Sequence, residues 1–561
     1  MEIENIKLAI ISNCNSELVE NYIKKEFKKE SITIESQCFD NSRISLNVLN
    51  SEYVNFNPSM VVVIISSHIL YEEYLRAVGE NRLYFAENCV QEIKNLWKII
   101  RTNAAVVFQT NCIEIPDSTY GNCTMRFENS FLYQIRKLNY LLAEACRDNE
   151  GIIPFDILKY QNRLGYDAVF SAPAFFSALM PYSLSFIKIF AREWFDLYKS
   201  IKGLIVKCIV VDLDNTIWGG ILSEDGVGEL LISGSDLGRA FQYFQLWLKA
   251  MKRRGLLLAI CSKNDLDQVL KVFHEREDMV LKFEDFSACE ISWHNKSEGI
   301  LRIRDRLGIG LEHMLFIDDS PFERKSVKND LPELIVPNMP EDPSEYISYL
   351  SSFTYFNSNT NDELGENRTI HFNNESKRDA LRLDYKDEES YLKKLDMRVR
   401  YGNVSNPQAD RVSQLLNRCN RFNLRTQRAT VDQVKRLMMD KSFCLMYFTL
   451  EDIYEDYGMV SVVVGKKITS DTIFIDNWVL SCRAFGRDVE KAIFNAFINT
   501  MKQMNIKQIV GEYLPTKKND MVKDLYLKFG FEICEDGTYL LRVQNYSEMQ
   551  NLISLEYGEK T

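Results

Sequence analysis

The stretch that most constrains the fold is KCIVVDLDNTIWGG, residues 207–220. Its apolar run, residues 208–211, is typical of a strand buried on both faces of a parallel sheet. Asp212 and Asp214 follow at the strand end, where carboxylates two positions apart point to the same side. They can share one hard divalent cation while one of them attacks phosphorus, and the cation offsets the repulsion of a phosphate dianion. The motif alone leaves a solvated strand end open as the alternative.

Two later stretches repeat the pattern of an apolar strand that ends in polar residues. GLLLAICSKND, residues 255–265, predicts a second buried strand, and HMLFIDDSP, residues 313–321, predicts a third that ends in two aspartates. Lys296 opens a helical segment between them. The order Asp-x-Asp, Ser, Lys, Asp-Asp resembles the four motifs of the haloacid dehalogenase (HAD) phosphohydrolase superfamily.

The resemblance to that superfamily implies a role for each matching residue. Asp212 corresponds to the phosphoryl-accepting nucleophile, and Asp214 to the general acid/base that also binds metal through its backbone. Further roles follow for the other motifs: Ser262 and Lys296 hold the phosphoryl oxygens, Asp319 ligates Mg²⁺ with Asp212 and Asp214, Asp318 orients Lys296, and Thr216 and Asn264 lie beside the phosphate. We therefore expect Mg²⁺ as the cofactor.

The spacing of the motifs predicts a site without a large cap. Most positions between Ser262 and Lys296 are needed for a helix and a strand, and the glycine-containing stretch after Thr216 has room for a loop or small hairpin only. An open site admits a substrate that is attached to something bulky, whereas a small free metabolite benefits from a lid that excludes water.

Length and composition place limits on the whole chain. Its 561 residues are too many for one ordinary core, so a multidomain α/β protein of three or four domains is expected. It has no apolar run of the roughly 20 residues that a membrane helix needs, and its first residues lack the basic start of a signal peptide, which predicts a cytoplasmic protein. The 13 scattered cysteines are expected to be reduced. A net charge of −11 argues against nucleic acid as the main partner.

Residues 1–205 read as an α/β domain that is similar to SGNH hydrolases in having a strand that ends in Ser12-Asn13. A GDS nucleophile block and an Asp-x-x-His near the end of the domain are not found, and His68 is the domain's sole histidine. A structural or docking domain is therefore favoured over a second hydrolase. Residues 206–345 are assigned to the HAD-like domain and residues 346–399 to a linker and connecting helix.

Residues 400–545 predict a further α/β domain that resembles GNAT acyltransferases. In TIFIDNWVLSCRAFGRDVEKAIF a strand, a loop and a helix follow one another, so backbone amides at the helix start can face an anion, helped by Arg483 and Arg487. Arg483 and Gly486 match the coenzyme A pattern R-x-x-G-x-G/A, but Asp488 departs from it. An aspartate weakens the case for coenzyme A and favours a carrier arm with one phosphodiester; an ordinary helix start is the alternative.

A second basic feature of this domain is a run of arginines. If helical, they would form one positive stripe, which is either a solvated face or a dock for an acidic carrier protein: Arg418, Arg421, Arg425 and Arg428.

Taken together, the motifs resemble the FkbH-like family, HAD-type glyceryl transferase/phosphatases with a GNAT-like C-terminal domain. The resemblance is strongest in VVDLDNTIWGGILSEDG, AICSKND, FIDDSPFER, NRCNRFNLRT, VLSCRAFGR and EYLPTKKN. It implies that a thiol attacks the acyl phosphate of 1,3-bisphosphoglycerate, the 3-phosphate is removed at the HAD site, and the glyceryl group passes to the phosphopantetheine arm of an acyl carrier protein for polyketide or peptide synthesis.

The acyl-accepting thiol has two candidates. Cys261 precedes Ser262 and lies near Lys263 and Lys296, which would lower its pKa, although neighbouring residues on a strand point to opposite faces. Cys482, beside Arg483, is the alternative, and for each a buried inert thiol stays open. An alternative hypothesis also stays open: the chain could be a phosphatase or acyltransferase of capsule or glycan synthesis.

Overall fold

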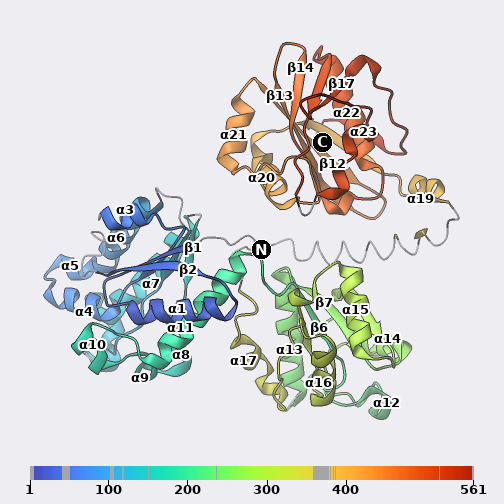
Figure 1. Cartoon of the computed structure of the whole chain (residues 1–561). Coiled ribbons are helices and arrows are strands. Elements are labelled where there is room, and N and C mark those ends of the chain that lie inside the picture. Colours follow the sequence, from blue (N-terminus) through green and yellow to red (C-terminus); the bar gives the residue numbers. More distant parts are fainter. Residues whose placement is uncertain are drawn as a thin grey trace. The chain divides into compact units, whose positions relative to one another are not determined.

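The computed structural model consists of two compact units, Met1–Glu366 and Asn367–Thr561, which are described separately. It describes residues 6–40, 51–101, 106–116, 119–149, 151–234, 237–357, 374, 378, 381–382, 385, 387–516 and 519–558, except for the side chains of Arg418 and Cys482. Figure 1 shows the elements and labels many of them. None of the helices in this part of the chain is long and apolar enough to cross a bilayer.

The first unit begins with a five-stranded parallel sheet in the order β2-β1-β3-β4-β5. Its central strand β3, MVVVI, is apolar and buried along its whole length, as expected for a strand covered on both faces. The bounds are β1 (Ile6–Ser12), β2 (Ile34–Asp40), β3 (Met60–Ile64), β4 (Val106–Thr110) and β5 (Ile152–Phe155).

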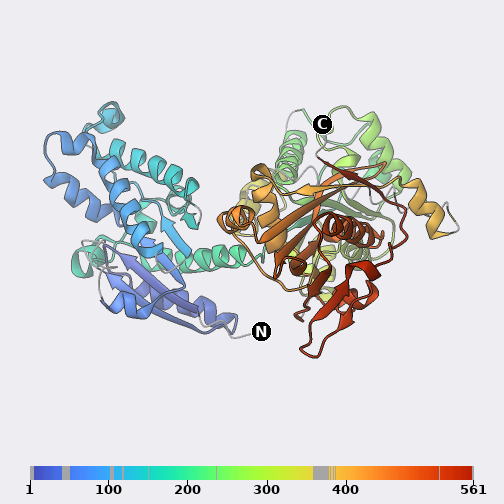
Figure 2. The ribbon, with the colours of Figure 1, turned by 90° about the horizontal axis from the view of Figure 1, so that it is seen from above.

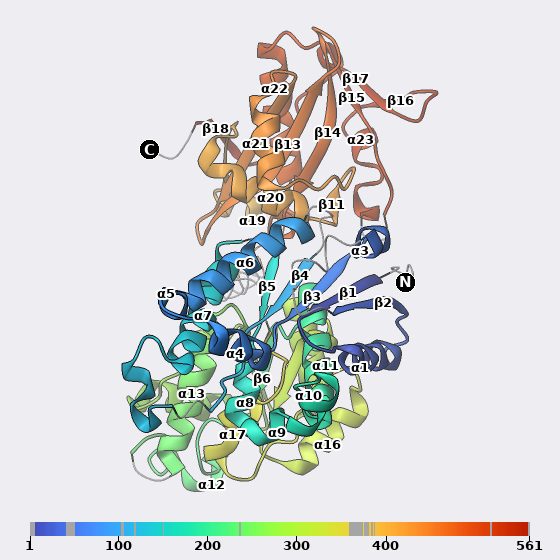
Figure 3. The ribbon, with the colours of Figure 1, turned by 90° about the vertical axis from the view of Figure 1, so that its left-hand side faces the viewer.

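Helices cover both faces of this sheet (Figure 3). One face packs against α1 (Glu17–Lys29) and α11 (Leu184–Ile201), and the other against α4 (Ser67–Arg76), α6 (Phe85–Ile100) and α7 (Phe131–Arg147). The shorter helices are α3 (Ser51–Phe56), α5 (Glu80–Leu83), η2 (Gly121–Arg126), α8 (Leu158–Leu164), α9 (Tyr166–Val169) and α10 (Ala172–Ala178).

A second parallel sheet follows in the same unit, with the order β8-β7-β6-β9. Its strands are β6 (Cys208–Val211), β7 (Leu257–Ser262), β8 (Ala288–Ile291) and β9 (Met314–Ile317). The helices are α12 (Leu222–Asp225), α13 (Leu237–Arg253), α14 (Leu266–Glu275), α15 (Lys296–Leu307), α16 (Pro321–Asp330) and α17 (Tyr346–Ser351), with 3-10 turns η3 (Phe283–Asp285), η4 (Leu311–His313) and η5 (Pro343–Glu345). Tyr346 and Leu350 of α17 belong to this core, so the domain extends past residue 345.

The described part of this domain carries no large cap, which confirms the predicted fold class. Between Thr216 and α13 the described chain forms α12 and a single bridge from Gly219 to Leu231. Between β7 and α15 it forms α14, η3 and β8.

The second unit is built on a nine-stranded mixed sheet, β16-β17-β15-β14-β13-β12-β10-β18, with β11 paired to β14. The strands are β10 (Arg398–Asn403), β11 (Phe422–Asn423), β12 (Phe443–Glu451), β13 (Asp456–Lys467), β14 (Thr472–Leu480), β15 (Gln508–Gly511), β16 (Glu532–Ile533), β17 (Tyr539–Arg542) and β18 (Ser554–Tyr557). The helices and turns are α19 (Glu388–Lys394), η6 (Asn406–Gln408), α20 (Ala409–Arg418), α21 (Val431–Met439), η7 (Cys482–Ala484), α22 (Val489–Gln503), η8 (Asp520–Val522), α23 (Leu525–Lys528) and η9 (Val543–Asn545).

Two cores lie on opposite faces of this sheet. The larger includes α22, whose Phe494 stacks on Trp478 of β14 with ring centroids 5.7 Å apart, and the smaller lies under α20 and α21. Figure 2 shows the red helix α22 against the orange strands. The chain runs from β14 through α22 into the parallel strand β15, the predicted strand, loop and helix of a GNAT-like fold.

The ends of this unit differ from the predicted boundaries of 400 and 545. Tyr391, Leu395 and Met397 pack into the larger core, so residues 388–397 belong to the domain and not to the linker. At the other end β18 pairs with β10. Most of the predicted linker loop, 351–377, lies outside the described residues.

The predicted arginine stripe does not form. Helix α20 ends at Arg418 and the chain turns into β11, so the following arginines do not share a helix face. Arg425 is instead drawn into ion pairs with Asp476 and Glu512, both at 2.7 Å.

Candidate functional site

The register of the second parallel sheet brings the predicted site residues to one edge. Val211 of β6 lies opposite Ile260 of β7 and Ile317 of β9. The residues that follow these three positions therefore stand at the same level at the carboxyl ends of the strands, where ligands bind in open α/β sheets.

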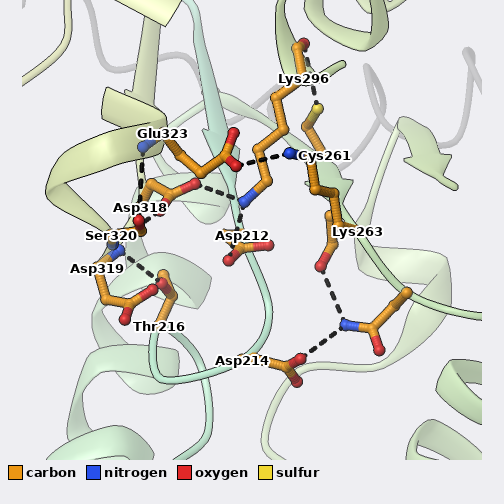
Figure 4. A network of polar contacts seen from close by, with 12 residues as sticks. Asp212, Asp214, Thr216, Cys261, Lys263, Lys296, Asp318, Asp319, Ser320 and Glu323 are labelled. Carbon is orange, nitrogen blue, oxygen red and sulfur yellow. Dashed lines mark hydrogen bonds and ion pairs between the residues drawn. The ribbon is translucent and has the colours of Figure 1, made fainter. Parts of the chain in front are cut away.

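Lys296 joins two of these strand ends. It is the first residue of α15, is buried, and its Nζ lies 3.1 Å from Asp212 Oδ2 and 2.6 Å from Asp318 Oδ2 (Figure 4). Burial opposes the charge of the ammonium group, but Asp212 and Asp318 outweigh it and raise the pKa of Lys296. The contact with Asp318 is the orienting contact that the resemblance implied.

Three carboxylates surround the space beside this lysine. Oxygens of Asp212, Asp318 and Asp319 lie within 4.8 Å of one another, which suits a hard cation that prefers oxygen ligands. Both oxygens of Asp318 are used, by Lys296 and by the backbone N–H of Ser320. Asp212 Oδ1 is buried and has no hydrogen-bond partner among the described residues. A buried carboxylate oxygen without a donor fits a bound cation, so these residues fit Mg²⁺.

Asp214 is held outside this cluster by three donors. Its Oδ1 accepts hydrogen bonds from Trp218 Nε1 (2.9 Å) and the Leu222 N–H (3.2 Å), and its Oδ2 accepts one from Asn264 Nδ2 (3.0 Å). Burial raises the pKa of Asp214, although these bonds act in the opposite direction. A carboxyl with a raised pKa is suited to donate and accept a proton. The Asp214 side chain therefore fits the acid/base role, and its backbone carbonyl is the group that could bind the metal.

The remaining predicted phosphate contacts lie at the same edge. Ser262 and Asn264 are buried, and Asn264 Nδ2 donates to Ser262 Oγ at 3.2 Å. Thr216 is fully buried and its Oγ1 accepts from the Asp319 N–H at 3.2 Å, which fixes the loop after β9 against the loop after β6.

Arg324 is a site residue that the sequence reasoning missed. Its Nη1 donates to the carbonyl oxygens of Asp318 (2.7 Å) and Asp319 (2.6 Å), and its side chain is buried. The pair of aspartates is thus fixed by its backbone as well as by Lys296. Its position in FIDDSPFER, within a stretch that carries the family resemblance, was the available signal.

Cys261 does not face the cluster. Its Sγ donates to the Lys296 carbonyl oxygen at 3.6 Å and points away from Asp212 (Figure 4). Helix α15 covers it closely, since a β-carbon at Gly299 would lie 3.0 Å from the sulfur. Burial raises the pKa of the Cys261 thiol to about 12. The predicted lowering of its pKa is therefore not seen.

Lys263, which was expected to assist this thiol, has another partner. Its Nζ donates to Glu323 Oε1 of α16 at 2.6 Å. The side chain of the alternative thiol, Cys482, lies outside the described residues.

In the second unit, the predicted carrier-arm loop is present but one of its arginines turns inward. Gly486 has φ 73° and Asp488 has φ 58°, and α22 begins at Val489 without a side-chain cap. Arg487 is buried, contacts the Tyr457 hydroxyl and lies 3.7 Å from Asp452 Oδ2. The expectation that Arg487 faces an anion is therefore corrected, and Arg483, which is half-buried, remains beside the loop.

A buried ion-pair cluster explains this inward turn. The Arg378 side chain is 1% exposed and the Asp452 side chain is fully buried, and Arg378 donates to Asp452 at 2.8 and 3.0 Å. Arg378 also lies over the ring of Tyr457 at 5.0 Å. Burial opposes ionisation of Asp452, but the bonds from Arg378 outweigh it and hold the pKa of Asp452 below its usual range. A buried carboxylate with this charge attracts Arg487 as a further partner.

The N-terminal domain shows no nucleophile–histidine pair among its described residues. His68 Nε2 pairs with the Tyr166 hydroxyl at 2.8 Å, and the ring stacks on Phe170 at 3.7 Å. Ser12 Oγ contacts Cys14 Sγ at 3.1 Å. The role of this domain as a structural or docking domain stays a prediction.

Comparison with known proteins agrees with this architecture. The family model of the FkbH N-terminal domain matches residues 7–199. The N-terminal part of BF1531 from Bacteroides fragilis, which contains a phosphatase domain and was solved in complex with Mg, is 29% identical with a TM-score of 0.61, over 64% of this chain and 95% of that chain. No protein of curated function matches the sequence.

Solved acetyltransferase structures align with part of this chain at low scores. Ard1 from Thermoplasma volcanium is 18% identical over 26% of this chain and 97% of its own, and the ribosomal-protein-S18-alanine N-acetyltransferase of Escherichia coli is 11% identical over 27% and 97%, each with a TM-score of 0.21. The match of the N-terminal domain and the likeness to the BF1531 structure agree with the motifs around Asp212 and Lys296. Together these findings support an FkbH-like protein that carries a HAD-type phosphatase domain.

Proposed function

We propose that the first unit removes a phosphate group from a phosphorylated acyl substrate with the help of Mg²⁺. The observation that carries this is the buried Lys296 held between Asp212 and Asp318, beside the unpartnered Asp212 Oδ1. The likeness to the BF1531 structure, a phosphatase domain complexed with Mg, supports the metal.

Asp212 and Asp319, with the backbone carbonyl of Asp214, would hold the cation. When bound, Mg²⁺ neutralises charge on the phosphoryl oxygens and permits a carboxylate to approach them. The Lys296 ammonium and the Ser262 hydroxyl would bind the same oxygens. Thr216 and Arg324 keep the strand-end loops in position for this.

The reaction uses the two aspartates of the first motif in sequence. An oxygen of Asp212 attacks phosphorus, the bond from phosphorus to the ester oxygen breaks, and Asp214 gives that oxygen its proton. A water molecule then attacks the aspartyl phosphate while Asp214 takes up the proton, which releases phosphate and restores Asp212. The raised pKa of Asp214 fits both proton transfers.

Replacing the nucleophile tests this proposal. Asp212→Asn is expected to lower Mg²⁺-dependent phosphate release at least about a thousandfold, or about 4 kcal/mol of barrier, because an amide is a poor nucleophile and a weaker metal ligand. Asp305→Asn, on the exposed face of α15, is the matched control and should leave the rate unchanged. Near-normal phosphate release by Asp212→Asn would remove the assignment.

We also propose that the substrate derives from 1,3-bisphosphoglycerate and that the glyceryl group is transferred to the phosphopantetheine thiol of an acyl carrier protein. The support is the resemblance of the motifs to FkbH-like glyceryl transferases, together with a site that no large cap covers in the described residues. In the second unit, Arg483 and the free amides at the start of α22 can bind the single phosphodiester of a carrier arm. An enzyme thiol that carries the acyl group between the two steps remains a prediction, since Cys261 is covered by α15.

A further inference from the structure

A pocket of about 450 Å³ opens in the second unit, apart from the loop at the start of α22. It lies between α21, the segment 427–429 and strands β12, β13 and β14. Its walls combine apolar side chains, among them Leu437 and Val464, with polar ones. The volume is within the range of small-molecule sites and far above that of one inorganic ion.

Three cations border this pocket: Arg428, Arg436 and Lys466. No described carboxylate forms an ion pair with any of them, whereas most other arginines of the unit are paired. The acidic residue in the lining, Asp476, is neutralised by Arg425 at 2.7 Å. In a chain of net charge −11, three cations around one pocket with no ion-pair partner among the described carboxylates favour an anionic ligand.

Asn477 gives a second, independent sign of a ligand. It lines the pocket, is 2% exposed, and its Oδ1 has no hydrogen-bond partner in the described structure. Its Nδ2 donates to the Gln427 carbonyl at 3.0 Å, which fixes the orientation of the amide. An unsatisfied buried acceptor costs about 1–3 kcal/mol, so a ligand with an N–H or O–H at this point would satisfy it.

The residue just before the lining segment 427–429 has a strained backbone conformation. Thr426 has φ 54°, which is rare for a β-branched residue, and its N–H donates to Asn423 Oδ1 at 2.7 Å. The Ala429 carbonyl accepts from Ser413 Oγ (2.7 Å) and Asn417 Nδ2 (2.8 Å). Backbone strain that several contacts maintain is typical of binding sites.

We propose that this pocket binds a phosphate monoester on a short chain that carries an amide or hydroxyl hydrogen. The phosphate would lie among Arg428, Arg436 and Lys466, the hydrogen would be donated to Asn477 Oδ1, and the chain would rest on the apolar wall. Pantetheine 4′-phosphate and 3-phosphoglycerate both have this chemistry, the first with amide hydrogens and the second with a hydroxyl. The proposal does not depend on the reaction assigned to the first unit.

Isothermal titration calorimetry of the full chain tests this. Pantetheine 4′-phosphate, 3-phosphoglycerate and inorganic phosphate are titrated separately in EDTA, where without a cation the carboxylates of the first unit repel phosphate. One of the two esters should bind saturably and more tightly than inorganic phosphate. The ester that binds tighter identifies the donor group. Raising the salt from about 0.05 to 0.5 M should weaken binding, because the cations are exposed.

Matched variants place the ligand in the pocket. Arg436→Gln and Lys466→Gln should each weaken binding of the ester about five- to tenfold, since each removes a charge-assisted contact. The neighbouring Lys435→Gln and Lys467→Gln, which do not line the pocket, should change it less than about twofold. Absence of saturable binding by both esters, or equal weakening by the control variants, would overturn the proposal.

Discussion

At the scale of single residues, strand geometry decides which side chains reach the phosphatase site. Successive residues of a strand alternate between faces, so Ser262 and Cys261 cannot both point to the cluster. In the structure Ser262 lies at the phosphatase site, whereas Cys261 lies under α15. The sequence predicts that only one of the two side chains can face the site. It does not predict which one, because Cys261 is covered by packing against Gly299, 38 residues later in the chain.

The burial of Cys261 leads to a prediction about its reactivity. Because its thiol is 2% exposed and burial raises its pKa to about 12, it should resist iodoacetamide at pH 8 in the free enzyme. Cys123, which is exposed, should be alkylated first. Peptide mass spectrometry after timed alkylation measures both. Rapid alkylation of Cys261 would show that α15 opens readily, which is the movement that an acyl-accepting role of this thiol requires.

A second residue-scale prediction concerns His68. Burial lowers its pKa to about 4, so the folded protein binds a proton less readily than the unfolded chain, whose histidine titrates near 6.5. Stability should be unaffected by His68 above pH 6.5 and fall as the pH drops from 6.5 to 4, by about 2 kcal/mol at pH 5.

The variant His68→Phe, which keeps a ring against Phe170, isolates this effect. The loss of urea stability between pH 7.5 and pH 5 should be smaller in the variant than in the wild type by about 2 kcal/mol. An equal loss in both proteins would mean that His68 is protonated as easily in the folded state as in the unfolded chain.

At the scale of elements, the loop before α22 shows where local pattern stops being informative. The strand, loop and helix were predicted from apolar runs and a glycine, and they are present. The inward direction of the Arg487 side chain was not predicted. It depends on contacts with Asp452 and Tyr457, which belong to the preceding hairpin. The arginines after α20 show the same limit, since the helix ends at Arg418 and its continuation was an assumption.

The cluster around Asp452 should be the main support of that loop. Arg378→Ala leaves a fully buried carboxylate without its closest partner and should destabilise the second unit by about 3–5 kcal/mol. Hydrogen–deuterium exchange of the intact protein should speed up in peptides that cover β13 and the start of α22.

Arg382→Ala is the matched control for this substitution. Its pair with Glu388 is 60% exposed on both sides, so its loss should cost less than about 1 kcal/mol and leave exchange unchanged. Equal exchange in the Arg378 and Arg382 variants would show that the buried cluster is not a support of the loop.

At the scale of the whole molecule, the division into α/β domains was open to prediction because each strand carries its own apolar signal and its own polar end. The domain limits were less accessible. Residues 388–397 join the second unit through Tyr391 and Leu395, and β18 pairs with β10 across about 150 residues of sequence. Neither contact can be predicted from the local composition.

Because the phosphatase residues and the loop before α22 belong to different units, the two proposed reactions should be separable by mutation. Arg483→Ala removes a cation at the loop and should lower transfer of the acyl group to a holo carrier protein about ten- to a hundredfold, the loss of roughly 1.5 to 3 kcal/mol expected for a charge-assisted contact. Mg²⁺-dependent phosphate release should stay near the wild-type rate. Arg421→Ala, an exposed arginine outside the loop, is the control.

A comparison of acyl acceptors tests which thiol the second unit recognises. Transfer from 1,3-bisphosphoglycerate should be measured by intact-protein mass spectrometry with holo carrier and apo carrier, and with free coenzyme A by analysis of its thioester. Asp488 and Glu490, at the start of α22, disfavour the larger negative charge of coenzyme A, and Arg487 is committed to Asp452. We therefore expect transfer to the holo carrier alone. Equal transfer to coenzyme A by the wild type would make the second unit an ordinary coenzyme A-dependent acyltransferase.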